Sequence, residues 1–330
     1  MITTAAKMFS PMKSAAAIAF LLAIGCDYSA PAREEVPRGM VDQNWPSIPA
    51  DAVFGQVSAV EVDSHGHVFV LHRAGREWEE PFTTEPIAQP TVFMFDQAGE
   101  LLAKWGAGTF VMPHGLSVDA DDAIWITDVA REQVFRFSHD GEQELVIGER
   151  GVTAQDDRHF GRPADVAFLG DRVLVADGYV NTRVAEFGSK GAFQRDWGAF
   201  AVAHGIAVDQ ERIYVADREN ARIQVFSHDG ELLETRKSAA GNHTYGLAAM
   251  GDGWLAAVEG RDGADRTGAI VRVYRPDGSI ERSVDIGLEG ENASLGHDIA
   301  MGPDDMAYVT DVYGNRVVRF KLPRAQASGK

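Results

Sequence analysis

The sequence is nearly free of cysteine, because Cys26 is the only one among 330 residues. Disulfides within the chain are therefore excluded, and its stability has to come from packing. Basic residues are also scarce: 31 lysines and arginines stand against 49 aspartates and glutamates, and the net charge is −18. Nucleic-acid binding needs a basic surface, so we expect no nucleic-acid partner. Beyond Cys26 the chain has no apolar run of membrane-spanning length.

The most apolar run lies near the N-terminus. Two lysines precede the apolar residues 15–24, and the sequence continues through one glycine to Cys26. This ending resembles a bacterial lipobox, in which the cysteine is lipidated and becomes the new N-terminus. We therefore expect a lipoprotein-type signal peptide at residues 1–26 and an exported protein anchored to a bacterial membrane through Cys26. A plain signal peptide is the alternative. Residues 27–44, which contain proline and glycine, are predicted to be a flexible tether.

One pattern recurs six times, with copies starting near residues 57, 112, 162, 202, 245 and 295. Each copy has a short apolar strand, a second strand and a third strand, and several copies then have an Asp-Gly turn such as residues 140–141. In four copies the second strand ends in aspartate, at Asp128, Asp177, Asp217 and Asp311. Short β-branched and aromatic strands without a long helical period indicate an all-β array.

Such an array predicts a six-bladed β-propeller with four strands per blade, because closure into a ring hides the sheet edges. We expect the propeller to span residues 45–322 and a C-terminal tail to follow at residues 323–330. The last copy is one strand short. We expect the segment around Trp45–Phe54 to supply the missing outer strand and close the ring.

Three histidines occupy the same position in three copies: His114, His204 and His297. They belong to the second, fourth and sixth copies, so in a ring of six they lie about a third of a turn apart. The repeat does not itself require histidine, because the other copies have Ser58, Ala164 and Tyr245. Three imidazoles that point at one axis predict a metal site with an open position. Imidazole suits zinc and several other transition metals.

A second group of residues directly follows the second strands: Arg73, Tyr179 and Arg218. They should surround the same mouth of the propeller. An arginine beside a phenol favours the phenolate, which suits proton abstraction, and the other arginine suits a substrate carboxylate. The alternative is that both arginines form structural ion pairs with strand-end aspartates, as we expect for Arg183 and Arg222 on the third strands.

Asp298 directly follows the third histidine. A carboxylate at the axis beside inward-pointing backbone carbonyls is a hard-cation site suited to Ca²⁺. Aspartate is common at this repeat position, so this signal alone is weak.

The repeats resemble NHL repeats, and several strings resemble peptidyl-α-hydroxyglycine α-amidating lyase, the second catalytic domain of the animal peptide-amidating enzyme. The resemblance covers about residues 45–322. The strings include Pro-His-Gly-Leu-Ser at 113–117, Asp-Gly-Tyr-Val-Asn-Thr-Arg at 177–183, Ala-Asp-Arg-Glu-Asn-Ala-Arg at 216–222 and His-Asp-Ile at 297–299. The family reaction cleaves R-CO-NH-CH(OH)-COOH into an amide and glyoxylate.

The resemblance also implies roles for individual residues. The three histidines would hold catalytic Zn²⁺, Tyr179 would be the base, and Arg73 and Arg218 would complete the active site. A structural Ca²⁺ on the axis would be bound by the Asp298 carboxylate and by the backbone carbonyls of Val60 and Leu116. We expect a monomer that acts on a small molecule or peptide ending in α-hydroxyglycine.

The sequence departs from the family at several positions. Val180 and Val225 stand where the resemblance implies half-cystines, and Leu295 stands where it implies a methionine beside the third histidine. No copper hydroxylase domain accompanies the repeats in this sequence, which leaves the source of the substrate open. Two other classes also remain: a Ca²⁺-dependent lactonase-type propeller hydrolase, and a non-catalytic NHL interaction scaffold on a lipid anchor. Histidines in alternate copies favour the lyase over both.

Overall fold

A computed structural model describes residues 37–42, 44–260, 268–287 and 294–324. The expected signal peptide with Cys26, residues 27–36 of the expected tether and residues 325–330 of the tail lie outside the described residues. Within the described ranges, no helix has the length and apolar character needed to cross a membrane.

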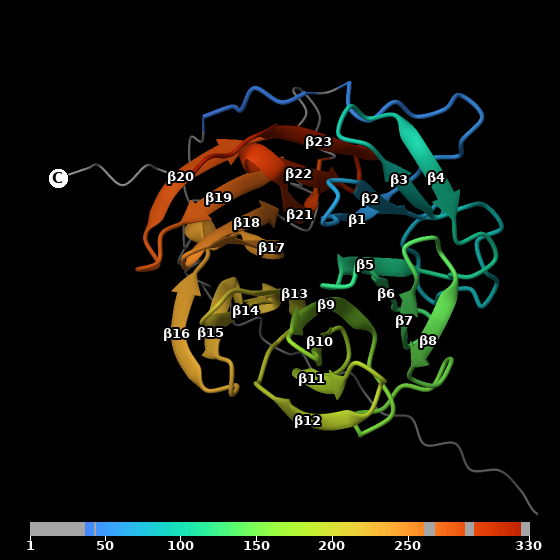
Figure 1. Ribbon diagram of the computed structural model, residues 1–330. Coiled ribbons are helices and arrows are strands. Elements are labelled where there is room, and N and C mark those ends of the chain that lie inside the picture. The colour runs from blue at the N-terminus through green and yellow to red at the C-terminus, as the bar shows by residue number, and fades with distance from the viewer. Residues whose placement is uncertain (1–36, 43, 261–267, 288–293, 325–330) are drawn as a thin grey trace, which may run out of the picture. The chain divides into compact units, whose positions relative to one another are not determined.

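Six antiparallel sheets form a ring around a central axis, and chain order runs around the ring (Figure 1). The predicted all-β six-bladed propeller is therefore confirmed. The innermost strands begin within a few residues of the predicted copy starts, at Val57, Pro113, Pro163, Ala203, His243 and Gly296. Only three short 3-10 helices are found among the described residues: Arg218–Asn220, Ala239–Gly241 and Pro303–Asp305.

Each blade runs outward from its innermost strand. The first blade consists of β1 (Val57–Val62), β2 (Val68–His72), β3 (Val92–Phe95) and β4 (Leu101–Trp105). The second consists of β5 (Pro113–Val118), β6 (Ile124–Asp128), β7 (Gln133–Phe137) and β8 (Gln143–Ile147). The third consists of β9 (Pro163–Leu169), β10 (Arg172–Asp177), β11 (Arg183–Gly188) and β12 (Phe193–Trp197). The fourth blade consists of β13 (Ala203–Val208), β14 (Arg212–Asp217), β15 (Arg222–Ser227) and β16 (Leu232–Lys237). The fifth consists of β17 (His243–Gly251), β18 (Trp254–Gly260), β19 (Ile270–Tyr274) and β20 (Ile280–Asp285). The sixth consists of β21 (Gly296–Gly302), β22 (Met306–Asp311) and β23 (Arg316–Lys321).

The aspartates that end the second strands are structural. In the second blade, the Asp128 carboxylate accepts hydrogen bonds from the amides of Val111 and Met112, which lie just before the innermost strand. These backbone bonds hold the chain where it enters β5. The same aspartates pair with third-strand arginines elsewhere, at Asp177–Arg183 (2.9 Å) and Asp217–Arg222 (2.6 Å). The structural ion pairs expected for Arg183 and Arg222 are therefore confirmed.

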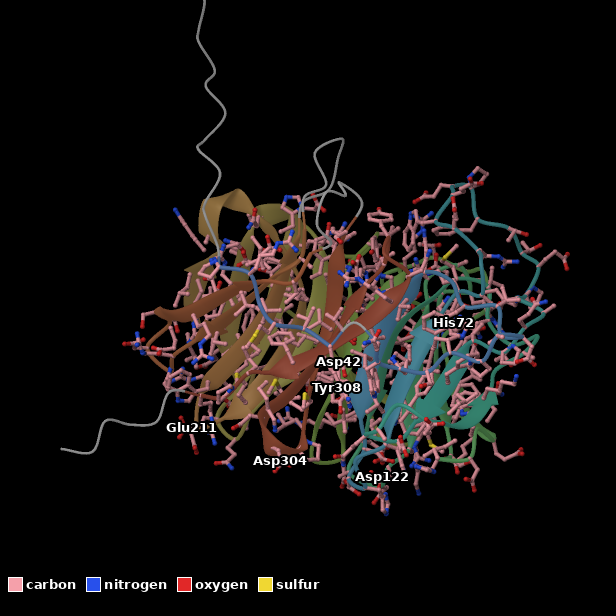
Figure 2. All side chains as sticks on the ribbon, turned by 90° about the horizontal axis from the view of Figure 1, so that it is seen from above. Asp42, His72, Asp122, Glu211, Asp304 and Tyr308 are labelled. Carbon is pink, nitrogen blue, oxygen red and sulfur yellow. The ribbon has the colours of Figure 1, made fainter. Side chains whose placement is uncertain are left out.

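The closure of the ring differs from the prediction. The last sheet has three strands, and the segment around Trp45–Phe54 forms no fourth strand among the described residues. Instead, Asp42 makes a single antiparallel bridge to Arg319 on β23, where the N-terminal segment crosses the last blade (Figure 2). The buried indole of Trp45 then packs between blades, with ring centroids 4.9 Å from Tyr308 and 5.8 Å from Phe95. Side-chain packing thus replaces most of the expected strand pairing.

Candidate active site

His114, His204 and His297 meet at the propeller axis, as their repeat positions predict. One ligand nitrogen from each lies within 4.8 Å of those of the other two. The ring centroids are 4.7 to 4.9 Å apart, and all three side chains are buried. Each histidine comes from an innermost strand, β5, β13 or β21, so three alternate blades build the group.

Local backbone irregularities direct these side chains to the axis. The pairing between the first and second strands shifts register at Pro113/Leu116, Ala203/Ile206 and Gly296/Ile299, which brackets each histidine. Such bulges re-aim side chains out of the regular pleat. They could not be predicted from the sequence, because a bulge has no unique residue signature.

The glycines after the first two histidines allow neighbouring blades to approach. A Cβ atom on Gly115 would lie 2.4 Å from the Ala164 carbonyl oxygen, and one on Gly205 would lie 2.4 Å from the Tyr245 carbonyl oxygen. Only glycine permits this approach without a shift of the backbone. The same two carbonyls are the acceptors for His114 and His204.

Each imidazole is oriented by the blade that follows it in the ring. Nδ1 donates to the carbonyl of Ala164 (2.8 Å) in His114, of Tyr245 (2.9 Å) in His204 and of Ser58 (2.6 Å) in His297. These acceptors are the repeat-equivalent residues of the copies that lack histidine. A backbone carbonyl at Nδ1 fixes the tautomer with the proton there and leaves Nε2 to bind a metal.

The environment keeps the imidazoles neutral. Burial lowers the pKa of His297 to about 3, and the nearby positive charges of Arg73 and Arg218 act in the same direction. Burial also lowers the pKa of His114 and of His204 well below its usual value, with further effects of the other histidines and the arginines. Neutral imidazole is the form that binds metal.

The donor set fits a transition-metal ion. Zinc–nitrogen bonds of about 2.0–2.1 Å place tetrahedral ligand atoms about 3.3 Å apart. The ligand nitrogens of the three histidines lie within 4.8 Å of one another, so small movements of the rings reach this spacing. The three histidines would supply three neutral nitrogen ligands and leave one position for water or substrate. Nitrogen ligands of this kind suit zinc and several other transition metals.

Tyr179 lies directly beside the imidazoles. Its Oη atom is 2.9 Å from Nε2 of His114 and 3.2 Å from Nε2 of His204. Arg218 Nη1 donates to the same Oη at 3.1 Å, and the Arg218 guanidinium carbon lies 5.0 Å from the Tyr179 ring centroid. The structure thus brings together the phenol, an arginine and the predicted metal ligands.

Arg73 is held at the same mouth by different contacts. Its Nε donates to the Pro113 carbonyl at 3.2 Å, and its Nη1 donates to Gln56 at 2.9 Å. Burial lowers the pKa of Arg73 to about 10, so the side chain remains a cation at neutral pH. Arg218 forms an ion pair with Glu219 at 2.8 Å. These contacts are not to strand-end aspartates, although the charge of Asp128 acts on Arg73.

A cavity of about 420 Å³ opens above the histidines at this end of the axis. Arg73, Tyr179 and Arg218 line it, as does Leu295 beside the third histidine. One wall of the cavity was not expected from the sequence: Trp78, whose ring lies 5.2 Å from the Tyr179 ring and 5.4 Å from the Arg73 guanidinium carbon. Trp78 lies in the loop between β2 and β3, outside the repeat pattern, so periodicity carries no signal for it.

The other end of the axis is acidic. Asp298 lines a cavity of about 250 Å³ together with Leu116, Glu61 and Asp165, and none of its lining residues is basic. Asp298 Oδ2 accepts a hydrogen bond from the Val60 amide at 3.0 Å. Burial raises the pKa of Glu61 and of Asp165 to about 7, and burial together with Asp165 raises the pKa of Asp298 well above its usual value. Of these three acidic residues, the sequence singled out only Asp298.

Fold and site together define a six-bladed β-propeller with a buried three-histidine centre and a tyrosine–arginine pair beside it. A model of the NHL repeat matches residues 200–226, in the fourth blade. Peptidyl-glycine alpha-amidating monooxygenase B of Xenopus laevis is 31% identical over 319 residues, which cover 86% of this chain and 36% of that protein. Peptidyl-alpha-hydroxyglycine alpha-amidating lyase 2 of Drosophila melanogaster is 32% identical over 245 residues, covering 66% of this chain and 60% of that protein. These homologues support the amidating-lyase family that the sequence resembles.

The chain spans about a third of the length of the Xenopus relative and three fifths of the Drosophila relative. Among solved structures, a gluconolactonase of Xanthomonas campestris is similar with a TM-score of 0.57 at 16% identity, covering 89% of this chain and 99% of that one. At this identity the likeness concerns the fold alone.

Proposed function

We propose that the chain is a zinc-dependent lyase that cleaves peptidyl-α-hydroxyglycine, or a similar N-acyl-α-hydroxyglycine, into an amide and glyoxylate. The observation that carries the proposal is the hydrogen bonding of Tyr179 Oη, which reaches two of the three axial imidazoles and Arg218 at distances of 2.9 to 3.2 Å. Similarity to proteins named as amidating lyases supports the same reaction.

The three Nε2 atoms would hold the metal. When bound there, Zn²⁺ supplies a Lewis acid for the hydroxyl oxygen of the substrate. Tyr179 accepts the proton of that hydroxyl group. As the C=O bond of glyoxylate forms, the C–N bond breaks, and the amide nitrogen takes the bonding pair and a proton, which Tyr179 can return. No other reactant is needed.

The two arginines have different tasks. Arg218 donates to Tyr179 Oη at 3.1 Å, and its positive charge stabilises the phenolate that must accept the proton. Arg73 lines the cavity as a cation and binds the substrate carboxylate with its planar guanidinium. The indole of Trp78 forms the apolar wall against which the acyl part of the substrate packs.

We also propose a structural Ca²⁺ at the acidic end of the axis, bound by the Asp298 carboxylate and by the carbonyls of Val60 and Leu116. Half-buried carboxylates that share a cavity without a basic neighbour are unfavourable unless a cation compensates them. Burial raises the pKa of both Asp165 and Asp298, and the charge of Asp165 raises the pKa of Asp298 further. Oxygen ligands of this kind suit Ca²⁺.

Export and anchoring through a lipid on Cys26 remain a proposal that rests on the residues before it. Mass spectrometry of the N-terminus of the native protein tests it. A cysteine at the mature N-terminus carrying a lipid agrees with the proposal, and an intact sequence before Cys26 contradicts it.

The deciding experiment is incubation of the zinc-loaded protein with α-hydroxyhippurate and measurement of glyoxylate. We expect glyoxylate release that stops when a chelator removes the metal. Absence of release from a protein that holds one zinc per chain at the axis would refute the lyase. Metal analysis separates the other classes: calcium alone favours a lactonase, and no bound metal favours a scaffold.

A further inference from the structure

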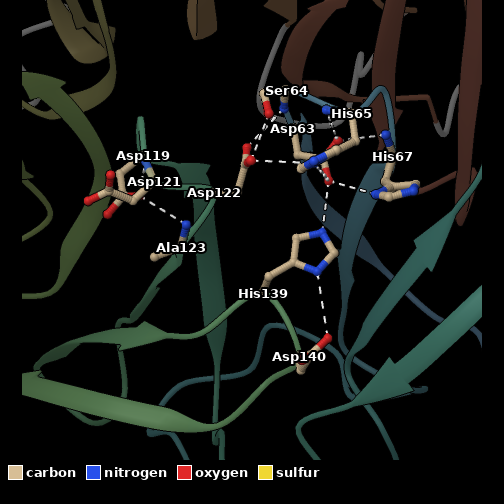
Figure 3. A network of polar contacts seen from close by, with 10 residues as sticks. All are labelled: Asp63, Ser64, His65, His67, Asp119, Asp121, Asp122, Ala123, His139 and Asp140. Atoms are coloured by element: carbon tan, nitrogen blue, oxygen red, sulfur yellow. Dashed lines mark hydrogen bonds and ion pairs between the residues drawn. The ribbon is translucent and has the colours of Figure 1, made fainter.

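A second cluster of histidines lies away from the axis, between the first and second blades. His65 and His67 belong to the turn that joins β1 to β2, and His139 belongs to the turn that joins β7 to β8. With Asp63 they form a group whose ligand atoms all lie within 4.8 Å of one another. Figure 3 shows His67 and His139 meeting Asp63 from two sides, with His65 between Asp63 and Asp122.

Asp63 is the centre of the cluster. Its side chain is fully buried, and its Oδ1 atom accepts the turn amides of His65 (2.9 Å) and His67 (2.7 Å). Its Oδ2 atom faces the imidazoles: Nδ1 of His67 is 2.8 Å away, Nε2 of His139 is 2.9 Å away, and Nδ1 of His65 is 3.9 Å away. These separations bracket the spacing of about 3.3 Å expected between ligands of one tetrahedral zinc ion.

The other blades indicate what this aspartate needs for structure alone. The second blade has the same four-residue turn, in which Asp119 Oδ1 accepts two turn amides. Its Oδ2 atom accepts from the indole of Trp125 at 2.9 Å. In the fourth blade, Asp209 Oδ2 accepts from the hydroxyl of Tyr214 at 2.8 Å. One aromatic donor, aided by Arg136 in the second blade, is therefore enough to satisfy this oxygen.

In the first blade, Phe69 stands at the position of that aromatic donor, and its side chain has no polar atom. A single histidine would replace the missing donor, yet three imidazoles gather there. The ring centroids of the three histidines are 5.5 to 6.1 Å apart. The excess of imidazoles over structural need points to a ligand.

The chain contains an internal comparison for His139. The pentapeptide Phe-Ser-His-Asp-Gly occurs at residues 137–141 and again at residues 226–230, in the equivalent turn of the fourth blade. There, Nε2 of His228 lies 3.1 Å from the Asp209 carbonyl oxygen. Within the described part of the chain, His228 belongs to no group of three or more side chains placed to share a metal ion. The turn therefore does not create a cluster by itself; the partners supplied by the neighbouring blade do.

We propose that Asp63, His65, His67 and His139 form a second transition-metal site, with Zn²⁺ as the ion that its three imidazoles and one carboxylate suit best. The partly exposed rings of His67 and His139 and the exposed ring of His65 give the ion access from solvent. Asp122 Oδ2 lies 3.3 Å from the same Nδ1 atom of His65 and would give up this contact when the ion binds. Small rotations of the rings convert these contacts into coordination.

The site is distinct from the axial centre. His67 lies just before β2 and Arg73 just after it, so the cluster is at the end of the blade opposite the tyrosine–arginine mouth. Its ligands come from turns of two blades. A bound ion would therefore tie the first blade to the second, and its role is structural.

Metal stoichiometry tests the proposal on the full chain. After chelation and dialysis against Zn²⁺, we expect two zinc ions per chain in the unmodified protein. His139→Asn, which lacks the second site, and His204→Ala, which lacks the axial site, should each bind one. His228→Asn, with the same change in the twin pentapeptide, should keep two. His139→Asn should also keep the glyoxylate-releasing activity, because it lies outside the axial site.

Thermal unfolding in the His204→Ala background gives an independent measurement. Zn²⁺ should raise the melting temperature of His204→Ala in a concentration-dependent way and should have no such effect on His204→Ala/His139→Asn. His65→Asn, at an exposed position that tolerates substitution, should weaken the second site in the same assay. Two zinc ions retained in His139→Asn, or no zinc bound to His204→Ala, would overturn the second site without bearing on the lyase.

Discussion

The Oη atom of Tyr179 is within hydrogen-bonding distance of His114, His204 and Arg218 at once. Substitution Tyr179→Phe removes only this atom. We expect glyoxylate release to fall by about 10²–10⁴-fold, the usual contribution of a general base, while bound zinc is unchanged. Steady-state kinetics and metal analysis of the same preparation measure both quantities. A near-normal kcat in Tyr179→Phe would place the base elsewhere.

His204→Ala is the matched comparison for that experiment. It removes a proposed metal ligand rather than the proposed base, so we expect both axial zinc and activity to be lost. The contrast between the two variants separates holding the metal from moving the proton.

The arginines should differ in their kinetic effects. Arg218 donates to the phenol, so Arg218→Ala should chiefly lower kcat. Arg73 donates to Gln56 and the Pro113 carbonyl and lines the cavity, so Arg73→Ala should chiefly raise KM, as expected for loss of uniform substrate binding. Both variants should retain zinc. Equal effects of the two substitutions on kcat with KM unchanged would contradict this division of roles.

At the scale of single elements, the strand-end aspartates position the histidines. Asp217 at the end of β14 accepts the Ala201 amide at 2.8 Å, just before the strand that carries His204, and it also binds Arg222 and Gln224. The carboxylate thus anchors the start of β13 to the rest of its blade.

Asp217→Asn weakens these bonds inside the blade. We expect the free energy of unfolding to fall by about 1–3 kcal/mol, the cost of leaving buried polar groups poorly satisfied. Zinc affinity should fall as well, because the segment just before the strand that carries His204 is held less firmly when the hydrogen bond to the Ala201 amide is weakened. Asp229→Asn, at an exposed turn of the same blade, is the control and should change neither quantity. Urea unfolding and zinc titration measure the two effects.

At the scale of the whole molecule, the ring is closed by packing around Trp45 rather than by a full strand. Trp45→Ala empties a buried site between the last and first blades, and large-to-small changes of this kind typically cost about 3–5 kcal/mol. Met40→Ala, in the same segment but 98% exposed, should leave stability unchanged. Equal unfolding midpoints for the two variants would show that the segment does not close the ring.

The acidic end of the axis should make stability depend on pH. The pKa of Asp165 and of Glu61 is raised to about 7 from usual values of 3.8 and 4.5, mainly by burial. The folded state therefore binds more protons than the unfolded state between about pH 4 and about pH 7, and the stability that these groups contribute is lost progressively as the pH rises to about 7. Relative to Asp165→Asn, chelator-treated protein should thus lose stability between about pH 4.5 and about pH 7.5.

Two controls isolate this effect. Asp165→Asn should flatten the decline, and Ca²⁺ should restore the stability of the unmodified protein at the alkaline end. The axial histidines act in the opposite direction below about pH 6.5, because their pKa values are lowered. Asp165→Asn retains these histidines, so its comparison with the unmodified protein isolates the carboxylates. Identical pH profiles of the unmodified protein and Asp165→Asn would mean that the carboxylates are compensated in another way.

The repeat period alone determined the number of blades, the positions of the innermost strands and the convergence of His114, His204 and His297. Equivalent positions in a closed ring must point the same way, so spacing along the chain translates directly into geometry. The position directly after the second strand likewise predicted that Arg73, Tyr179 and Arg218 share one mouth. These inferences needed only local periodicity and the requirement of closure.

Contacts between residues from different copies were decided by the tertiary structure. The bulges around the histidines, the carbonyl acceptors from the next blade and the indole of Trp78 depend on how neighbouring blades pack, which no single repeat encodes. Packing between blades also decides that Trp45, and not a fourth strand, closes the ring. It likewise decides the contacts of His139, because His139 and His228 lie in identical pentapeptides but contact different partners. The sequence determines which donor and acceptor groups each repeat position carries, and packing between blades determines which partner each group contacts.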